Sequence, residues 1–328
     1  MIRNSKLKIL IITPVNHIKG VADKLKDIGS TTFIDDPFES DIQEIIPNYD
    51  IIFTNPNKSK IFLGKRLLKA AKNLKIICTA STGTNHIDID YASSNGIRVL
   101  SLTKEKHVID KISSTAEHAF ALTLASLRNI TTSYYDTMKG NWNYEKFIGR
   151  QMDSLTVGVV GYGRLGKFYS KYCITFGSRV LVYDPYVKIS KNGVEQIKNS
   201  SELITQSDII SIHVHVTETT KNMINKDWFS LMKKDVLIIN TSRGEIINEK
   251  DLVLFLKENK EARIATDVIS DEIKNRKNNL LMKYAKSSSQ VLITPHIGGM
   301  TKEAQEIAYN HAVDLIKRYI KNNLELYK

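Results

Sequence analysis

Three side chains able to bind an anion or move a proton each follow an apolar, β-branched run. Arg243 comes after residues 236–242, and His296 comes after residues 291–295. Glu272 stands in the loop that follows a third run. A planar guanidinium at the carboxyl end of a strand suits the capture of a carboxylate or the polarisation of a ketone. Singly, each residue fits a surface arginine, a loop glutamate or a turn histidine. Their order, spacing and common placement favour one catalytic site.

A glycine-rich turn joins another apolar run to a helix-like stretch. It reads Gly161, Tyr162, Gly163, Arg164, Leu165 and Gly166, between residues 156–160 and 168–176. In such a turn the first glycine permits a tight bend, the second lets the backbone approach a pyrophosphate, and the third lets the helix pack on the strand. The helix N-terminus then offers unpaired N–H groups to the phosphates. The turn, with Arg164 and Leu165, therefore predicts a dinucleotide site.

The acidic residue expected of such a site is also present. Asp184 ends the next apolar run, 18 residues after Gly166. A carboxylate there accepts hydrogen bonds from the ribose hydroxyls and repels the 2′-phosphate of NADP, so we expect NAD. The alternative is a solvent-facing turn aspartate before Pro185. The first half of the chain has no comparable turn, which places the cofactor in the second half.

Short apolar runs alternate with amphipathic stretches in two successive series. The first predicts strands at 7–12, 32–34, 51–54, 76–79 and 98–101, with helices at 21–28 and 63–72. The second predicts strands at 157–160, 180–183, 209–213, 236–239, 264–265 and 291–293. Continuous apolar strands alternating with helices are typical of parallel sheets covered on both faces. The fold class is therefore α/β, with two doubly wound parallel-sheet domains.

A single long helix is expected between the two series. In residues 113–135, Ala116, Phe120, Leu124 and Leu127 recur at helical spacing. Ser114 and Glu117 match the capping box near its start. This helix would connect the domains and could help to form a dimer.

Composition excludes several classes of protein. The chain has 328 residues, 42% hydrophobic and 25% charged, with a formal charge of +12. No run reaches the roughly 18–20 apolar residues of a membrane-spanning helix. Cys78 and Cys173 have no partner at metal or disulfide spacing, which indicates a reducing cytoplasm. The scattered lysines fit a solvated surface better than a nucleic-acid site, although they would also attract a small anion.

At several segments the sequence resembles the D-isomer-specific 2-hydroxyacid dehydrogenase family. The matching segments are Ser81 to Asp88 (STGTNHID), Ser114 to His118 (STAEH), the glycine turn, Asn240 to Gly244 (NTSRG), Asp267-Val268, and Thr294 to Gly299 (TPHIGG). They cover nearly the whole chain in the family's order. The resemblance is to phosphoglycerate dehydrogenase-like members, and we expect no C-terminal regulatory domain because the chain stops at Lys328.

The resemblance implies a role for each site residue. Arg243, Glu272 and His296 would be the catalytic triad, with His296 as acid and base and Arg243 holding the substrate. Thr82 and Gly83 would offer backbone N–H groups to the substrate carboxylate. Asp267 would bind the nicotinamide carboxamide, and Thr241, Ser242 and Gly299 would also contact NAD. No metal is implied.

The resemblance also implies a discontinuous domain and a partner. A Rossmann NAD-binding domain, 103–299, would be inserted into a flavodoxin-like substrate domain, 1–102 and 300–328. The stretch 302–319 would form a helix that returns to the first domain. We expect a homodimer, with no nucleic-acid or membrane partner.

Three departures from the family pattern stand out, one of them Ile273, which occupies a position where proline is common. His213-Val214-His215 has histidine where proline is usual, and residues 103–112 do not follow the usual pattern. In a strand the two histidines would face the same side, but a third metal ligand is missing nearby in sequence, so we expect a small change of loop shape instead.

The substrate remains open among small D-2-hydroxy acids and their 2-oxo acids. Candidates are 3-phosphoglycerate with phosphohydroxypyruvate, where Lys58 or Lys60 could face the phosphate, and glyoxylate or hydroxypyruvate. Formate dehydrogenase is a lesser alternative, because that group pairs its histidine with glutamine. An NAD(H)-sensing scaffold of the co-repressor kind is the alternative outside enzymes.

Overall fold

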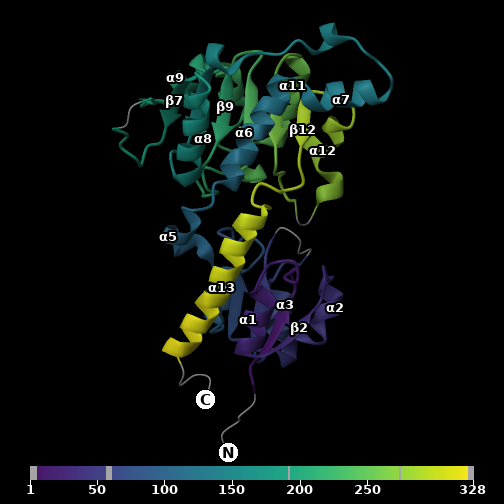
Figure 1. The fold of residues 1–328 in the computed structure, drawn as a ribbon, viewed down its shortest axis with the longest axis vertical. Coiled ribbons are helices and arrows are strands. Elements are labelled where there is room, and N and C mark those ends of the chain that lie inside the picture. The colour runs from purple at the N-terminus through teal and green to yellow at the C-terminus, as the bar shows by residue number, and fades with distance from the viewer. Residues whose placement is uncertain (1–5, 57–60, 191–192, 273–274, 324–328) are drawn as a thin grey trace, which may run out of the picture. The chain divides into compact units, whose positions relative to one another are not determined.

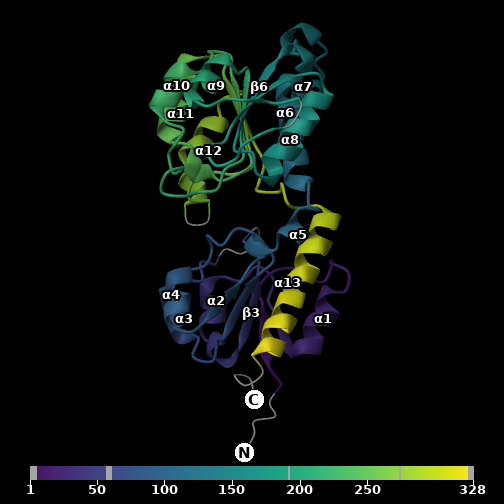
Figure 2. The same ribbon diagram turned by 90° about the vertical axis from the view of Figure 1, so that its left-hand side faces the viewer.

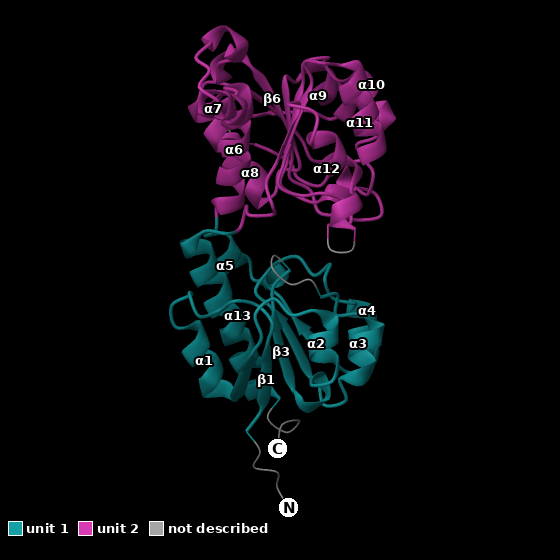
Figure 3. Cartoon of the chain, turned by 90° about the vertical axis from the view of Figure 1, so that its right-hand side faces the viewer, with its two compact units in different colours: residues 1–112, 300–328 teal, residues 113–299 magenta. Residues whose placement is uncertain are grey.

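The chain folds into two compact units. The computed structural model describes residues 6–56, 61–190, 193–272 and 275–323. Contacts divide the chain into unit 1, residues 1–112 with 300–328, and unit 2, residues 113–299 (Figure 3). The stretch 103–112, which the sequence analysis groups with the nucleotide domain, makes its contacts in unit 1.

Unit 1 is built on a parallel sheet. Among its described residues five strands pair in the order β2-β1-β3-β4-β5, which is the doubly wound order of flavodoxin-like domains. The strands are β1 Lys8–Ile11, β2 Ser30–Phe33, β3 Ile51–Thr54, β4 Ile76–Thr79 and β5 Arg98–Leu100. Each central strand is buried on both faces, as its unbroken apolar run predicts.

Helices cover both faces of this sheet. α1 (Val21–Ile28) and α13 (Lys302–Asn322) lie side by side on one face, and α2 (Glu39–Gln43), α3 (Lys65–Ala70) and α4 (Ile89–Ser94) cover the other (Figures 1 and 2). Small side chains recur on the buried face of α13 at Ala304, Ala308 and Ala312, so the helix backbone approaches the sheet closely. The predicted returning helix is thereby confirmed, three residues longer than expected.

Unit 2 contains the second parallel sheet. Its described residues form seven strands in the order β12-β11-β10-β9-β6-β7-β8. The strands are β6 Thr156–Val160, β7 Arg179–Tyr183, β8 Glu195–Gln196, β9 Ile209–Ile212, β10 Leu237–Asn240, β11 Arg263–Thr266 and β12 Val291–Ile293. The strand order reverses between β6 and β9, which is the switch point where Rossmann domains bind dinucleotides. The predicted fold class is confirmed for both units.

The helices of unit 2 also lie on both faces of its sheet. α6 (Ser114–Leu127) and α8 (Arg164–Thr175) cover one face, followed by α7 (Ile130–Met138) (Figure 3). α9 (Ser200–Gln206), α10 (Lys226–Leu231), α11 (Glu249–Glu258) and α12 (Leu280–Ala285) cover the other. The remaining helices of the described chain are α5 Lys106–Ile109 and the short 3-10 helices η1 Ile46–Asn48, η2 Leu102–Lys104, η3 Tyr144–Phe147, η4 Met152–Ser154, η5 Gly244–Ile246 and η6 Arg276–Asn278. Within the described ranges, no helix has both the length and the hydropathy to cross a membrane.

The prediction of one helix over 113–135 is wrong. α6 ends at Leu127, and Asn129 adopts a left-handed conformation (φ 54°) before α7 begins. The Arg263 guanidinium donates to the Ser126 carbonyl and to the Asn129 side chain, so a residue from β11 holds the break. The expected capping box at Ser114 and Glu117 is also wrong: the N-cap is Ser113, which makes no side-chain capping hydrogen bond and donates instead to the Glu117 carboxylate. The Ser114 hydroxyl is buried.

Candidate active site

Three neighbouring strands bring the predicted catalytic residues to one edge of the unit 2 sheet. Asn240 of β10 is in register with Thr266 of β11, and Thr266 is in register with Ile293 of β12. The loops that follow these strand ends carry the three side chains. Parallel pairing in register therefore places Arg243, Glu272 and His296 at the same edge, as their strand-end positions predict.

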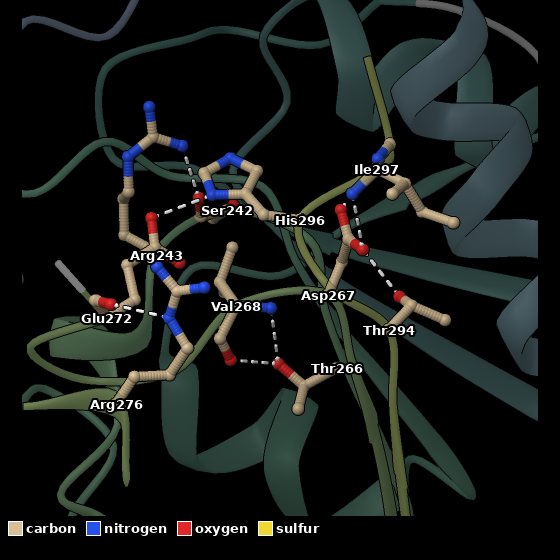
Figure 4. A network of polar contacts seen from close by, with 11 residues as sticks. Ser242, Arg243, Thr266, Asp267, Val268, Glu272, Arg276, Thr294, His296 and Ile297 are labelled. Atoms are coloured by element: carbon tan, nitrogen blue, oxygen red, sulfur yellow. Dashed lines mark hydrogen bonds and ion pairs between the residues drawn. The ribbon is translucent and has the colours of Figure 1, made fainter. Parts of the chain in front are cut away.

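His296 and Glu272 form a close ion pair. The imidazole Nδ1 lies 2.7 Å from the Glu272 carboxylate, and the two side chains are 20% and 19% exposed. Figure 4 shows the ring turned toward this carboxylate, with Arg243 in the same network of polar contacts. A carboxylate on Nδ1 fixes the orientation of the ring. The other ring nitrogen, Nε2, is then the atom that can exchange a proton.

The backbone of His296 is held in an uncommon conformation. Its φ of 56° lies in the left-handed region, which costs a residue with a side chain about 1 kcal/mol or more. The N–H groups of the next two residues, Ile297 and Gly298, donate to the Asp267 carboxylate at 2.9 and 2.7 Å. These bonds fix the turn directly after the strained residue.

Asp267 is a buried anchor of this loop. The residue is 2% exposed and accepts further hydrogen bonds from Thr294 and His118, the latter with Nε2 at 3.3 Å. Burial raises the pKa of its carboxyl group, but the hydrogen bonds from His118, Thr294, Ile297 and Gly298 outweigh burial and lower the pKa overall. Its predicted contact with the nicotinamide carboxamide remains a prediction.

His118 lies in one of the segments that match the family, but no role for it was expected from the sequence. His118 comes from α6 and also contacts Thr294, at 2.9 Å. The sequence signal that could have pointed to His118 was Asp267, because a buried carboxylate requires hydrogen-bond donors around it.

Arg243 is positioned by its neighbours in the β10 loop. Asn240 donates to the Arg243 carbonyl at 2.9 Å and accepts from the Ser242 N–H at 3.0 Å. A Cβ on Gly244 would lie 2.0 Å from the Ile269 carbonyl carbon. Glycine is therefore required there, because the loop after β10 touches the loop that leads to Glu272.

The glycine turn has the predicted shape. Gly161 has a φ of 93°, and a Cβ on Gly166 would lie 2.1 Å from the Gly161 carbonyl oxygen. Gly163, in contrast, has no heavy atom of the described residues within 4 Å of such a Cβ. α8 begins directly after it, at Arg164, and Leu165 packs against the core. The turn leaves open space beside a helix N-terminus, which fits a phosphate.

Asp184 lies against this turn. Its carboxylate accepts the Tyr162 N–H at 2.7 Å and the Tyr186 N–H at 2.9 Å. The residue thus links the end of β7 to the glycine turn, where ribose hydroxyls of a bound dinucleotide would lie.

Other polar atoms near the strand ends also fit a ligand. Thr241 is buried, and within the described residues its hydroxyl has no hydrogen-bond partner. Ser242 donates to the Ile212 carbonyl at 2.7 Å, which joins the loops after β9 and β10. Gly299 is open, with nothing described within 4 Å of an added Cβ. An unpartnered buried hydroxyl is costly unless a ligand or water completes it, so these residues fit NAD.

His213 follows β9 rather than lying within it, which corrects the premise that His213 and His215 share a strand face. Its Nε2 lies 2.8 Å from the Ser211 hydroxyl, and its ring packs 5.1 Å from that of Tyr169. Burial lowers the pKa of His213 to about 3. The imidazole is therefore neutral at physiological pH, and His215 is exposed.

The predicted substrate residues Thr82 and Gly83 belong to unit 1, in the loop after β4. Ser81 donates to the Gly83 carbonyl and Thr103 to the Thr82 carbonyl, each at 2.7 Å. Their role remains a prediction. Lys58 and Lys60, proposed to face a substrate phosphate, lie outside the described residues.

The two inner glycines should behave oppositely when mutated. Gly166→Ala forces backbone against backbone and should destabilise the chain by about 1–3 kcal/mol, measured by urea unfolding. Gly163→Ala should change stability by less than about 0.5 kcal/mol. However, it should weaken NADH binding about tenfold or more in a fluorescence titration, because the added methyl occupies the space of the pyrophosphate. Equal NADH affinity in Gly163→Ala and wild type would contradict this placement of the phosphates.

Known proteins match the chain in sequence and structure. Residues 120–298 match the family model "D-isomer specific 2-hydroxyacid dehydrogenase, NAD binding domain". D-3-phosphoglycerate dehydrogenase of Methanocaldococcus jannaschii is 30% identical over 97% of this chain and 58% of its own length. Hydroxypyruvate reductase of Thermotoga maritima is 31% identical over 86% of this chain and 88% of its own length.

A solved structure agrees with these matches. The NAD-dependent formate dehydrogenase of Staphylococcus aureus, in complex with NAD, has 27% identity and a TM-score of 0.82 over 96% of each chain. The chain spans about half the length of several curated relatives, among them the 58% of the M. jannaschii enzyme and 47% of the enzyme from Archaeoglobus fulgidus. Unit 2 is an NAD-binding domain, and the chain belongs to the D-isomer specific 2-hydroxyacid dehydrogenase family.

Proposed function

We propose that this chain is an NAD-dependent dehydrogenase that interconverts a small D-2-hydroxy acid and its 2-oxo acid. The observation that carries the proposal is the pair of His296 and Glu272, 2.7 Å apart at the strand edge that also bears Arg243. A general acid–base histidine oriented by a carboxylate, with a guanidinium beside it, suits proton exchange at the oxygen of a carboxylate-bearing substrate.

The cofactor would be held by the glycine turn, Asp184, Thr241 and Ser242, with Gly299 leaving room beside them. When bound, NAD exchanges a hydride with C2 of the acid. Arg164 and Leu165 begin the helix whose N-terminus faces the phosphates. Asp267 holds the His296 loop through hydrogen bonds to its carboxylate. A contact with the nicotinamide carboxamide would use a lone pair of this carboxylate that the loop N–H groups do not occupy.

His296 donates or accepts the proton that is exchanged with the substrate oxygen. In the reducing direction, protonated His296 gives its Nε2 proton to the C2 carbonyl oxygen of the 2-oxo acid. Glu272 stabilises the imidazolium before this transfer and keeps the ring oriented after it. In the oxidising direction, neutral His296 takes the hydroxyl proton. Arg243 binds the substrate carboxylate or carbonyl oxygen and stabilises the negative charge that develops there.

Related proteins suggest the substrate class. Relatives are a D-3-phosphoglycerate dehydrogenase and a hydroxypyruvate reductase, so the first candidates are phosphohydroxypyruvate with 3-phosphoglycerate, and hydroxypyruvate or glyoxylate. All are small anions, which the net charge of +12 would attract.

Two alternatives differ in their chemistry. A formate dehydrogenase would act on a one-carbon acid without proton exchange at a C2 oxygen, whereas Glu272 holds His296 for such an exchange. An NAD(H)-sensing scaffold would bind NADH with negligible turnover. A screen of phosphohydroxypyruvate, hydroxypyruvate, glyoxylate and pyruvate, following NADH loss at 340 nm, together with formate and NAD, following NADH gain, separates these cases.

We also propose a homodimer in the cytoplasm. Large apolar side chains are exposed together on α7 and in the segment through η3: Ile130, Tyr134, Tyr135, Met138, Trp142, Tyr144 and Ile148. A group of exposed large apolar side chains within one segment is typical of an interaction surface, and a second copy of the chain is the partner that the family resemblance implies. Both cysteines are buried and free, as suits a reducing compartment.

His296→Ala should lower kcat by about 10²- to 10⁴-fold, because the proton donor is lost. NADH affinity should stay within about twofold, since His296 makes its contacts with Glu272 and not with the glycine turn. His17→Ala, an exposed histidine of unit 1, is the matched control and should keep full kcat. The measurement is steady-state kinetics on the best 2-oxo acid. If His296→Ala kept the wild-type kcat, His296 would not be the acid–base residue.

Asp184→Asn should relax cofactor choice while keeping the glycine turn intact. The amide oxygen can still accept the Tyr162 N–H, but the charge that repels a 2′-phosphate is gone. We expect the ratio of kcat/KM for NADH over NADPH to fall about tenfold or more, and Asp184→Ala to weaken NADH binding as well. An unchanged ratio in both variants would rule out the proposed ribose contact.

Removal of exposed aromatics should disrupt the dimer. Trp142 and Tyr144 are 90% and 81% exposed, so Trp142→Ser with Tyr144→Ser should leave the fold intact. Light scattering should then give the mass of one 37.2 kDa chain instead of two. Tyr186→Ser, at a site 88% exposed outside this segment, should remain dimeric. A monomeric wild type would refute the dimer.

A further inference from the structure

We propose that Glu105, His107 and His311 form a binding site for a zinc-like divalent metal ion. One ligand atom from each side chain lies within 4.8 Å of the other two. The site is in unit 1, apart in sequence from every residue of the proposed catalytic edge. Two of its residues, Glu105 and His107, lie in the 103–112 stretch, which departs from the family pattern. The proposed reaction does not explain that departure.

The donor set suits zinc. Two imidazole nitrogens and one carboxylate oxygen are ligands of the three-residue type, in which water or another small ligand completes a tetrahedron. His311 and Glu105 are partly buried and His107 is exposed, so an ion could reach the site from solvent.

The ligand atoms need only small movements. His311 Nε2 lies 2.7 Å from the Glu105 carboxylate, whereas two ligands of one tetrahedral zinc ion stand about 3.3 Å apart. The His107 ring packs edge-on to the His311 ring, with the ring centres 5.5 Å apart. A rotation of side chains would bring the three atoms around an ion, with the backbone unchanged.

Packed elements hold the ligands in place. The Glu105 carbonyl accepts the N–H groups of Val108 and Ile109, at 3.0 and 3.1 Å, which fixes the start of α5. Val108 is buried, and Ile109 packs against the core that α13 completes. His311 lies in the middle of α13. A site on packed helices keeps its geometry better than a site on loop tips.

One cation competes for the same carboxylate. Arg318 lies 3.8 Å from Glu105 and is 54% exposed. An exposed ion pair of this kind is weak, so a metal ion would displace the arginine, and removal of Arg318 should tighten metal binding by a few-fold only. A bound ion would tie α5 to α13, and these are the unit 1 elements nearest to the two points where the chain passes between the units.

The alternative is that Glu105 and His311 form only an ion pair that joins α5 to α13, with His107 as a surface residue. The test uses the full chain without a polyhistidine tag, first treated with chelator. Zn²⁺ is titrated by calorimetry, and Co²⁺ is followed by its visible absorption. We expect one ion per chain, a tetrahedral Co²⁺ spectrum and a rise in Tm on metal addition.

Variants assign the ion to this site. His107→Ala removes the exposed ligand without touching the Glu105–His311 pair, so its metal-free Tm should equal that of wild type. Its affinity should fall about tenfold or more. His17→Ala, with an exposed histidine elsewhere in unit 1, should bind as wild type does. Arg318→Gln should bind more tightly, because the competing cation is gone.

Two results would overturn the proposal. One is the absence of a stoichiometric Co²⁺ spectrum in wild type. The other is unchanged affinity in both His107→Ala and Arg318→Gln, which would place any bound ion elsewhere. If His107→Ala lowers the metal-free Tm, its affinity also reflects a change in the fold. The metal affinity of Arg318→Gln, compared with that of wild type, then decides whether the ion binds at this site.

Discussion

The geometry of the proposed catalytic edge depends on how one buried carboxylate is satisfied. Asp267 leaves the end of β11 and accepts the N–H groups of Ile297 and Gly298 from the loop after β12. His118 of α6 and the Thr294 hydroxyl complete its shell. A buried charge with few donors would be costly, so this loop, α6 and β11 must keep their mutual positions for Asp267 to remain ionised.

That constraint reaches the chemistry through His296. The residue sits in a left-handed conformation, φ 56°, which isolated peptides disfavour. The hydrogen bonds that follow it in the loop hold it there and turn its ring toward Glu272. Strain held by surrounding structure is typical of functional sites. In the loop after β10, the close contact of Gly244 with the backbone of Ile269 performs a similar task for Arg243.

The elements that bury apolar runs on both faces could be predicted from the sequence. β3 and β4, which are buried throughout, match their predicted ranges, as does the partly buried edge strand β12, and the glycine turn occupies the strand-to-helix junction that its spacing indicates. Features set by distant partners could not. The break between α6 and α7 at Asn129 depends on Arg263, which is 134 residues away. The helical spacing of apolar residues within 113–135 therefore could not reveal it. β8 was missed because its two exposed residues, Glu195 and Gln196, have no apolar pattern. The pairing of Glu105 with His311 spans 206 residues, so the spacing of potential ligands along the chain could not reveal it.

His213, in the segment that departs from the family pattern, illustrates how burial decides whether a histidine carries a charge. A charged imidazole after β9 would stand beside the cofactor and alter its electrostatic surroundings. His213 instead packs on Tyr169, contacts the Ser211 hydroxyl and has a pKa lowered to about 3 by burial. It therefore adds no charge at neutral pH. Its carbonyl carbon and oxygen also lie close to the position that a Cβ on Gly161 would take, so the backbone here still helps to shape the glycine turn. The His213 N–H donates to the Val160 carbonyl at 2.8 Å, which extends the β6–β9 pairing one residue further at the switch point.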